Sequence, residues 1–193
     1  MKKSAEYRHE ARDIIKRYDS KFIVLTLIMV LIFGLTSACS YGLIGLIASG
    51  PLLVGYLGCI ITAVGGTDPV FESVFDGFKK FGRNLGAFLL YSLLVFAWSL
   101  LFIIPGIIAA YRYSLTFFLL KEREDLTVWE CFKKSHEMMR GHKWKLFCLQ
   151  FSYIGWDILV ALTAGILGLW IYPRQACAFY LFYKDIKAIN TIV

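Results

Sequence analysis

Long uncharged apolar segments dominate the pattern of hydrophobic and polar positions along this chain. Residues 22–39 read FIVLTLIMVLIFGLTSAC and residues 85–111 read LGAFLLYSLLVFAWSLLFIIPGIIAAY, and neither segment contains Asp, Glu, Lys or Arg. An uncharged run of about 18 or more residues is typical of a membrane-spanning helix. The pattern therefore predicts an all-α integral membrane protein, with a single polytopic domain over residues 1–193.

Six apolar segments, joined in pairs by short turns, predict about six transmembrane helices in three hairpins. The hairpins cover residues 22–66, 85–121 and 145–188. The position of the first turn stays open, because residues 22–66 are continuously uncharged and the turn could lie at 36–42 or at 48–51. The approximate spans are 22–46, 51–66, 85–104, 106–121, 145–170 and 174–188.

One proline lies near each predicted outer turn: Pro51, Pro105 and Pro173. Proline has no N–H and is tolerated in the first turn of a helix, so each is predicted to open the returning helix of its hairpin. The threefold recurrence either reflects an internal repeat or follows from any three helical hairpins.

The basic residues gather in clusters that alternate with the apolar segments. Of the 21 Lys and Arg residues, seven lie in residues 1–21, three in 79–83, seven in 121–145 and two in 184–187. Loops rich in Lys and Arg stay on the cytoplasmic side of a membrane. The pattern therefore places both termini in the cytoplasm and the protein in the cell (cytoplasmic) membrane.

Three amphipathic segments precede the predicted hairpins. In the basic N-terminal helix of residues 1–21, one stripe holds Ala11, Ile14, Ile15, Tyr18 and Phe22, with Lys and Arg on the other face. The second segment begins at the Asp68-Pro69 pair. The third begins at Thr127, which forms a capping-box pattern with Glu130.

These interfacial helices either brace the bundle or bind anionic lipid of the inner leaflet, for which the net charge of +7 gives an affinity. Nucleic acid is a poor partner, because the charge is divided among several loops of one membrane face. The candidate lipid contacts are Arg8, Arg12, Lys16, Lys79, Lys80, Lys133 and Lys134.

Motifs of enzyme chemistry are missing from the sequence. It has no G-x-S-x-G, P-loop or dinucleotide fingerprint. The HEMMRGH segment (136–142) has Arg140 where a zinc protease needs its second histidine. The five cysteines include no CxxC pair. We therefore expect no enzyme activity, no metal site and no cofactor.

Arg112 is the first of two charges predicted to lie inside the membrane, where a charged side chain is costly. With a turn near residue 105, position 112 returns to the depth of Trp98. A guanidinium over an indole ring forms a favourable cation–π pair. The alternatives are this structural pairing and a ligand or ion role for Arg112.

Asp157 is the second such charge. With a turn near residue 172, its depth matches Lys187, and Lys184 lies one helical turn away. A structural ion pair with either lysine is one interpretation, and a proton or substrate role is the other, because carboxylates within a membrane are often functional.

Four motifs resemble one family: IIPGIIAAYRYS (103–114), SHEMMRGHK (135–143), SYIGWDIL (152–159) and LTAGILGLWIYP (162–173). They resemble the bacterial integral membrane proteins catalogued as domain of unknown function 975, and the resemblance covers most of the chain after residue 50. It implies a multi-pass bacterial membrane protein and no specific activity. Asp157 and Arg174 depart from the family pattern, which usually has an apolar and an aromatic residue there.

The leading functional hypothesis is a non-enzymatic membrane component that binds lipid or a membrane partner, such as a second copy of the chain. The alternative is a small transporter or channel with Asp157 as its ion or proton site. A transporter needs a polar path, and the predicted spans contain few polar residues, which favours the first class.

Overall fold

The computed structural model describes residues 2–39, 43–101, 103–163 and 165–192. These residues are mostly helical and contain no strand, which confirms the all-α class. The helices are α1 (Ser4–Lys16), α2 (Asp19–Cys39), α3 (Leu43–Val64), the 3-10 helix η1 (Phe71–Val74), α4 (Asp76–Lys79), α5 (Phe81–Leu101), α6 (Ile103–Tyr113), α7 (Thr116–Glu122), α8 (Val128–Met138), α9 (Lys143–Phe151), α10 (Ile154–Leu162) and α11 (Gly168–Ile192).

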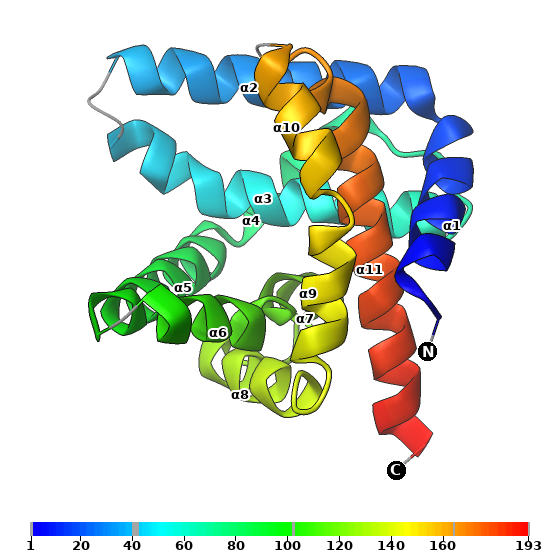
Figure 1. The fold of residues 1–193 in the computed structure, drawn as a ribbon. Coiled ribbons are helices and arrows are strands. Elements are labelled where there is room, and N and C mark those ends of the chain that lie inside the picture. Colours follow the sequence, from blue (N-terminus) through cyan, green and yellow to red (C-terminus); the bar gives the residue numbers. More distant parts are fainter. Residues whose placement is uncertain (1, 40–42, 102, 164, 193) are drawn as a thin grey trace.

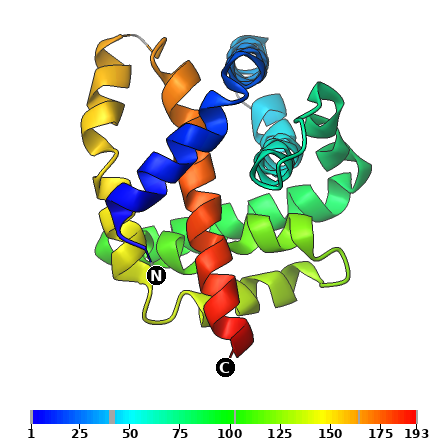
Figure 2. The same ribbon diagram turned by 90° about the vertical axis from the view of Figure 1, so that its right-hand side faces the viewer.

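Helices α2 and α3 are antiparallel, as are α5 and α6, and the C-terminal ends of α2 and α5 lie on the same side of the molecule (Figure 1). The long helix α11 runs crosswise to α2 and α3. Figure 2 views α2 and α3 end-on, whereas α11 still runs down the picture. The three predicted hairpins therefore do not lie parallel to one another.

Apolar helices with exposed side chains cover much of the outer surface. Within the part of the chain that the structure describes, two segments are long and apolar enough to cross a membrane, Phe81–Leu100 and Lys143–Leu162. Only 11% and 22% of the residues in their most apolar stretches are buried, whereas the core helix of a soluble protein is mostly buried. Apolar surface of this extent needs lipid or a partner, which supports membrane association. The six spans and the cytoplasmic termini stay predictions.

Helix α2 ends at Cys39 and α3 begins at Leu43, so the later of the two predicted turn positions, 48–51, lies within a helix. Residues 40–42, in the earlier predicted position, lie outside the described residues. Pro105 lies in the first turn of α6, as predicted. The prediction is wrong for Pro51 and Pro173, which lie inside α3 and α11 because both helices begin several residues earlier.

Two predicted spans are interrupted. The segment 145–170 divides into α9 and α10, with a break at Ser152 and Tyr153, and then turns at Gly165 (φ 86°) before α11 begins. The segment 106–121 divides into α6 and α7 at Ser114, whose Oγ donates to the Tyr111 carbonyl at 2.9 Å. A hydroxyl that bonds the preceding turn competes with the regular helical hydrogen bonds.

Of the three predicted amphipathic segments, the first and third form helices and the second is divided. On α1, Ala11 and Ile15 are buried as expected, together with Tyr7. On α8, the Thr127 hydroxyl accepts from the Glu130 N–H at 3.3 Å, and the Thr127 N–H donates to the Glu130 carboxylate at 2.7 Å, which confirms the capping box. The second segment is not one continuous helix but consists of η1 and α4.

Candidate functional site

A basic cavity of about 340 Å³ lies between α1, α10 and the beginning of α11. Arg8 and Arg12 of α1 and Arg174 of α11 line it, and none of its described lining residues is acidic. We call it the arginine cavity. Its other lining residues are Ala5, His9, Tyr153, Trp156 and Ile171.

The docking of α1 on α11 positions the first two arginines. Residues four apart lie on one face of a helix, so Arg8 and Arg12 project together. The neighbouring face buries Tyr7, whose hydroxyl donates to Asp185 Oδ2 at 2.6 Å. The Tyr7 ring also meets the Phe182 ring edge-on, with centroids 5.9 Å apart. These contacts fix the rotation of α1 about its axis and thereby aim its arginines at the cavity.

The three guanidinium groups are only partly occupied by protein partners. Arg8 Nη1 donates to the Ser152 carbonyl at 3.0 Å, and Arg174 Nη2 lies 3.4 Å from Asp19 Oδ1. The Nε atoms of Arg8 and Arg174 are buried and have no hydrogen-bond partner among the described residues. Arg12 is exposed. A buried donor without an acceptor is energetically costly, so an anion in this cavity would satisfy groups that the protein leaves open.

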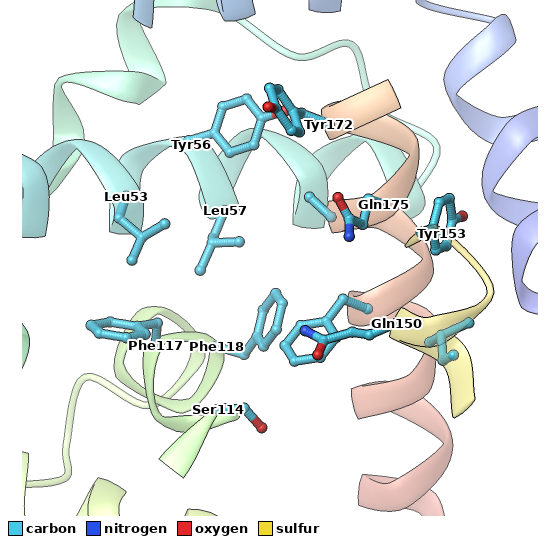
Figure 3. Close-up of a pocket in the computed structure, with 13 residues that line it drawn as sticks. Leu53, Tyr56, Leu57, Ser114, Phe117, Phe118, Gln150, Tyr153, Tyr172 and Gln175 are labelled. Atoms are coloured by element: carbon cyan, nitrogen blue, oxygen red, sulfur yellow. The ribbon is translucent and has the colours of Figure 1, made fainter. Parts of the chain in front are cut away.

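A second, mostly apolar cavity of about 320 Å³ lies between α3, α7, α9 and α11. We call it the central cavity. Leu53 and Leu57 point from α3 toward Phe117 and Phe118 of α7 (Figure 3). Tyr153 lines both cavities. The remaining lining residues are Tyr56, Ser114, Leu149, Gln150, Tyr172, Gln175, Ala176 and Phe179.

Glu122, at the end of α7, connects that helix to α11. Its carboxylate accepts hydrogen bonds from the hydroxyls of Tyr180 at 2.9 Å and Tyr183 at 3.0 Å, and it forms an ion pair with Lys187. Glu122 was not predicted from the sequence. A signal was available, because Tyr180, Tyr183 and Lys187 recur at spacings of three and four, which place them on one face of α11.

Arg112 and Trp98 are not brought together as predicted. Trp98 is 40% exposed on α5, and no cation–π contact joins the two side chains in the described part of the chain. The reason is the position of the turn. A Cβ on Gly106 would lie 2.2 Å from Ser99 Oγ, so these two residues are opposite each other, whereas a turn at residue 105 would place Gly106 at the depth of residue 104.

Arg112 instead belongs to a basic corner of α6, α8 and α9. Its carbonyl accepts from Ser135 Oγ at 3.0 Å, and its Nε is buried without a partner among the described residues. Burial lowers the pKa of the nearby His136, and the charges of Arg112 and Lys143 lower it further. The Nδ1 of His136 is likewise buried with no described partner.

The predicted pairing of Asp157 with Lys187 or Lys184 is wrong. Lys187 pairs with Glu122, and its Nζ lies 5.8 Å from the centre of the Tyr183 ring. Lys184 is exposed. Asp157 lies in the first turn of α10, and the turn at Gly165 brings α10 beside the beginning of α11 rather than its C-terminal end. No ion pair or hydrogen bond of the Asp157 side chain occurs among the described residues.

The candidate lipid contacts lie on separate elements. Arg8 and Arg12 meet Arg174 at the arginine cavity, while Lys16 is exposed further along α1. The others do not join this cavity: Lys79 pairs with Asp76, Lys80 pairs with Glu124, and Lys133 and Lys134 are exposed on α8.

Residues 99–190 match the model of a family described as protein of unknown function (DUF975). The match confirms the family that the four motifs resemble, although it begins at residue 99 rather than near residue 51. It includes Glu122, Tyr153 and Arg174 but not α1. No curated protein and no solved structure matches the chain.

Proposed function

We propose that this chain, whose residues 99–190 match the DUF975 family model, is a non-enzymatic membrane protein that binds the headgroup of an anionic lipid in the arginine cavity. The observation that carries the proposal is the convergence of three arginines, two of them with buried and unpartnered Nε atoms. Arginine presents several donors in a planar fork that suits phosphate oxygens.

The surroundings of the cavity favour a lipid over a water-soluble anion. Trp156 lines the cavity and is 45% exposed, and tryptophan is enriched where a protein meets the membrane–water interface. Ile158 and Leu162, further along α10, are 58% and 77% exposed. The helix that lines the cavity therefore also presents exposed apolar side chains on its other face, where lipid chains would cover them.

We further propose that the chain crosses the cell membrane several times and keeps both termini in the cytoplasm. The alternation of basic clusters with apolar hairpins supports this topology. An outer turn at Pro173 does not fit it, because Arg174 lies beside Asp19 and Arg12, at the N-terminal helices that the topology places on the cytoplasmic side. Fluorescent-protein fusions, which fold in the cytoplasm, should be fluorescent at either end of the chain. Fluorescence at one end alone would contradict the paired arrangement of the spans.

Native mass spectrometry of the full chain in detergent tests headgroup binding. Dioleoylphosphatidylglycerol and dioleoylphosphatidylcholine have the same chains and differ in headgroup charge. We expect the protein to prefer the anionic lipid, and Arg8→Gln or Arg12→Gln to weaken its binding about tenfold, since a bond to a charged group contributes about 1.5–3 kcal/mol. Arg140→Gln, at an exposed arginine outside the cavity, is the matched control.

Equal binding of the two lipids, or equal loss in Arg12→Gln and Arg140→Gln, would contradict the proposal. Transport through an Asp157 site has no described contact in its support, so it stays a prediction. Ion flux in proteoliposomes that disappears in Asp157→Asn would favour it over lipid binding.

A further inference from the structure

We infer that an anionic lipid bound at the arginine cavity places one of its acyl chains in the central cavity, passing beside Tyr153. This inference rests on the proposed function and adds the position of the chain. Its basis is that a charged cavity and an apolar cavity adjoin at one residue.

Tyr153 is the boundary between the two cavities. Its side chain is 5% exposed, and it lies in the break between α9 and α10, where the backbone turns from one helix into the next. On α11, Arg174 lines the arginine cavity, whereas the next two residues, Gln175 and Ala176, line the central cavity. A single helix thus presents adjacent residues to both cavities, so their linings are neighbours on α11 as well as at Tyr153.

The chemistry of the central cavity suits a hydrocarbon chain. Leucine side chains form one wall and phenylalanine rings the facing wall (Figure 3). Its volume of about 320 Å³ lies within the usual range for ligand sites. An acyl chain in this cavity would gain dispersion contacts with both apolar walls.

The polar side chains of the central cavity lie near Tyr153, where the acyl chain of the proposed lipid would join its glycerol group. Figure 3 shows Gln150 of α9 and Gln175 of α11 on the same side of the cavity as Tyr153. Gln150 Oε1 accepts from the Tyr111 hydroxyl at 2.5 Å, which orients the amide. Amide N–H groups at this position can donate to the ester carbonyls that join the chains to glycerol.

The charge complementarity of the adjoining arginines identifies the occupant as a chain of an anionic diacyl lipid. Inorganic phosphate would occupy the arginine cavity alone. A neutral lipid would fill the apolar cavity without satisfying the guanidinium groups. Only an anionic amphiphile uses both.

Photocrosslinking of the full wild-type chain tests the position directly. The probe is phosphatidylglycerol with a diazirine near the end of one acyl chain. We expect label on peptides that contain Phe117 and Phe118, and competition by unlabelled phosphatidylglycerol but not by phosphatidylcholine. Label confined to exposed faces, such as that of α5, would overturn the inference.

A variant that fills the central cavity separates this inference from the proposed function. Ala176→Phe should weaken binding of dioleoylphosphatidylglycerol at least about tenfold, equivalent to about two buried methylene groups, and leave dihexanoylphosphatidylglycerol unaffected. Ala161→Phe, on the exposed side of α10, should change neither. If Arg12→Gln weakens both lipids while Ala176→Phe weakens neither, the headgroup site stands and the chain position is wrong. If no variant has an effect, both are wrong.

Discussion

The Glu122 carboxylate receives three donors from one face of α11: the hydroxyls of Tyr180 and Tyr183 and the ammonium group of Lys187. Its side chain is only 16% exposed, so these bonds are shielded from water. Hydrogen bonds to a charged acceptor are stronger than those between neutral groups. Glu122 therefore fastens α7, the helix whose Phe117 and Phe118 form a wall of the central cavity.

Replacement of Glu122 by glutamine keeps the shape of the side chain and removes its charge. We expect Glu122→Gln to lower the free energy of unfolding by about 1–3 kcal/mol, since the three donors lose a charged acceptor. Thermal unfolding in detergent would measure the change. Glu124→Gln is the control, because Glu124 is an exposed partner of Lys80, and exposed pairs contribute little. Equal effects would contradict the special role of Glu122.

His136 predicts a dependence of stability on pH. Burial lowers its pKa in the folded chain from the ordinary value of 6.5, so the unfolded chain takes up the proton more readily. Stability should therefore decrease as the pH falls below about 6.5, until the folded-state pKa is passed and the loss is complete. His136→Gln should reduce the difference between melting temperatures at pH 7.5 and pH 5.5. An unchanged difference in His136→Gln would contradict this role of His136.

Residue contacts were predictable where they are local. The capping box of Thr127 and Glu130 follows from a spacing of three and was found as predicted. The partners of Glu122 lie 58 or more positions away, and Asp19 lies 155 positions from Arg174. No local pattern encodes such pairs. The predicted partners of Arg112 and Asp157 were wrong because they assumed turns near residues 105 and 172, and the turns lie elsewhere.

At the scale of elements, glycines set how closely α3 meets its neighbours. A Cβ on Gly55 would lie 1.8 Å from the Val74 carbonyl oxygen, and one on Gly77 would lie 1.9 Å from the Pro51 carbonyl oxygen. The backbones of α3, η1 and α4 therefore touch. The amphipathic segment that begins at Asp68-Pro69 was predicted as one helix, because an amphipathic pattern does not show where one backbone must lie against another.

Alanine at Gly77 would force these backbones apart. We expect Gly77→Ala to destabilise the fold by about 1–3 kcal/mol, the usual cost of overpacking. Gly86→Ala is the matched control in α5, since nothing lies within 4 Å of its added Cβ, and it should be neutral or stabilising by about 0.5–1 kcal/mol. The melting temperatures of both variants would measure these effects. An unchanged melting temperature of Gly77→Ala would contradict the close contact between the backbones.

Apolar length predicted the helical class but not the path of the chain. The segment 145–170 is a single run by hydropathy, yet it forms α9, α10 and the start of α11. Hydropathy sums side-chain character and contains no information on backbone breaks such as that at Ser152 and Tyr153. Tyr153, at this break, lines both cavities, so the cavities could not be foreseen from the sequence.

At the scale of the whole molecule, the arginine cavity combines residues from inside and outside the region that matches the family model. Arg174 belongs to the region that matches the family, whereas Arg8 and Arg12 come from α1, outside it. Arg174 also departs from the family pattern described above. The proposed headgroup site is therefore expected to be a property of this chain rather than of the family as a whole.

The exposed apolar surface predicts how the protein partitions in the cell. Helices such as α5, with Leu93 63% and Leu100 71% exposed, need lipid or a partner to cover them. We expect the protein to remain in the membrane pellet after extraction with alkaline carbonate and to be released by detergent. Release by carbonate, as seen for a peripheral protein run in parallel, would contradict an integral membrane protein.

The contact between Tyr7 and Asp185 joins residues 178 positions apart. During synthesis, α1 leaves the ribosome long before α11 exists, so its buried face must wait for its partner. The arginine cavity consequently closes only after α11 has emerged. Until then Tyr7, Ala11 and Ile15 of α1 stay exposed. A chain truncated before α11 would keep this apolar face exposed to chaperones and proteases.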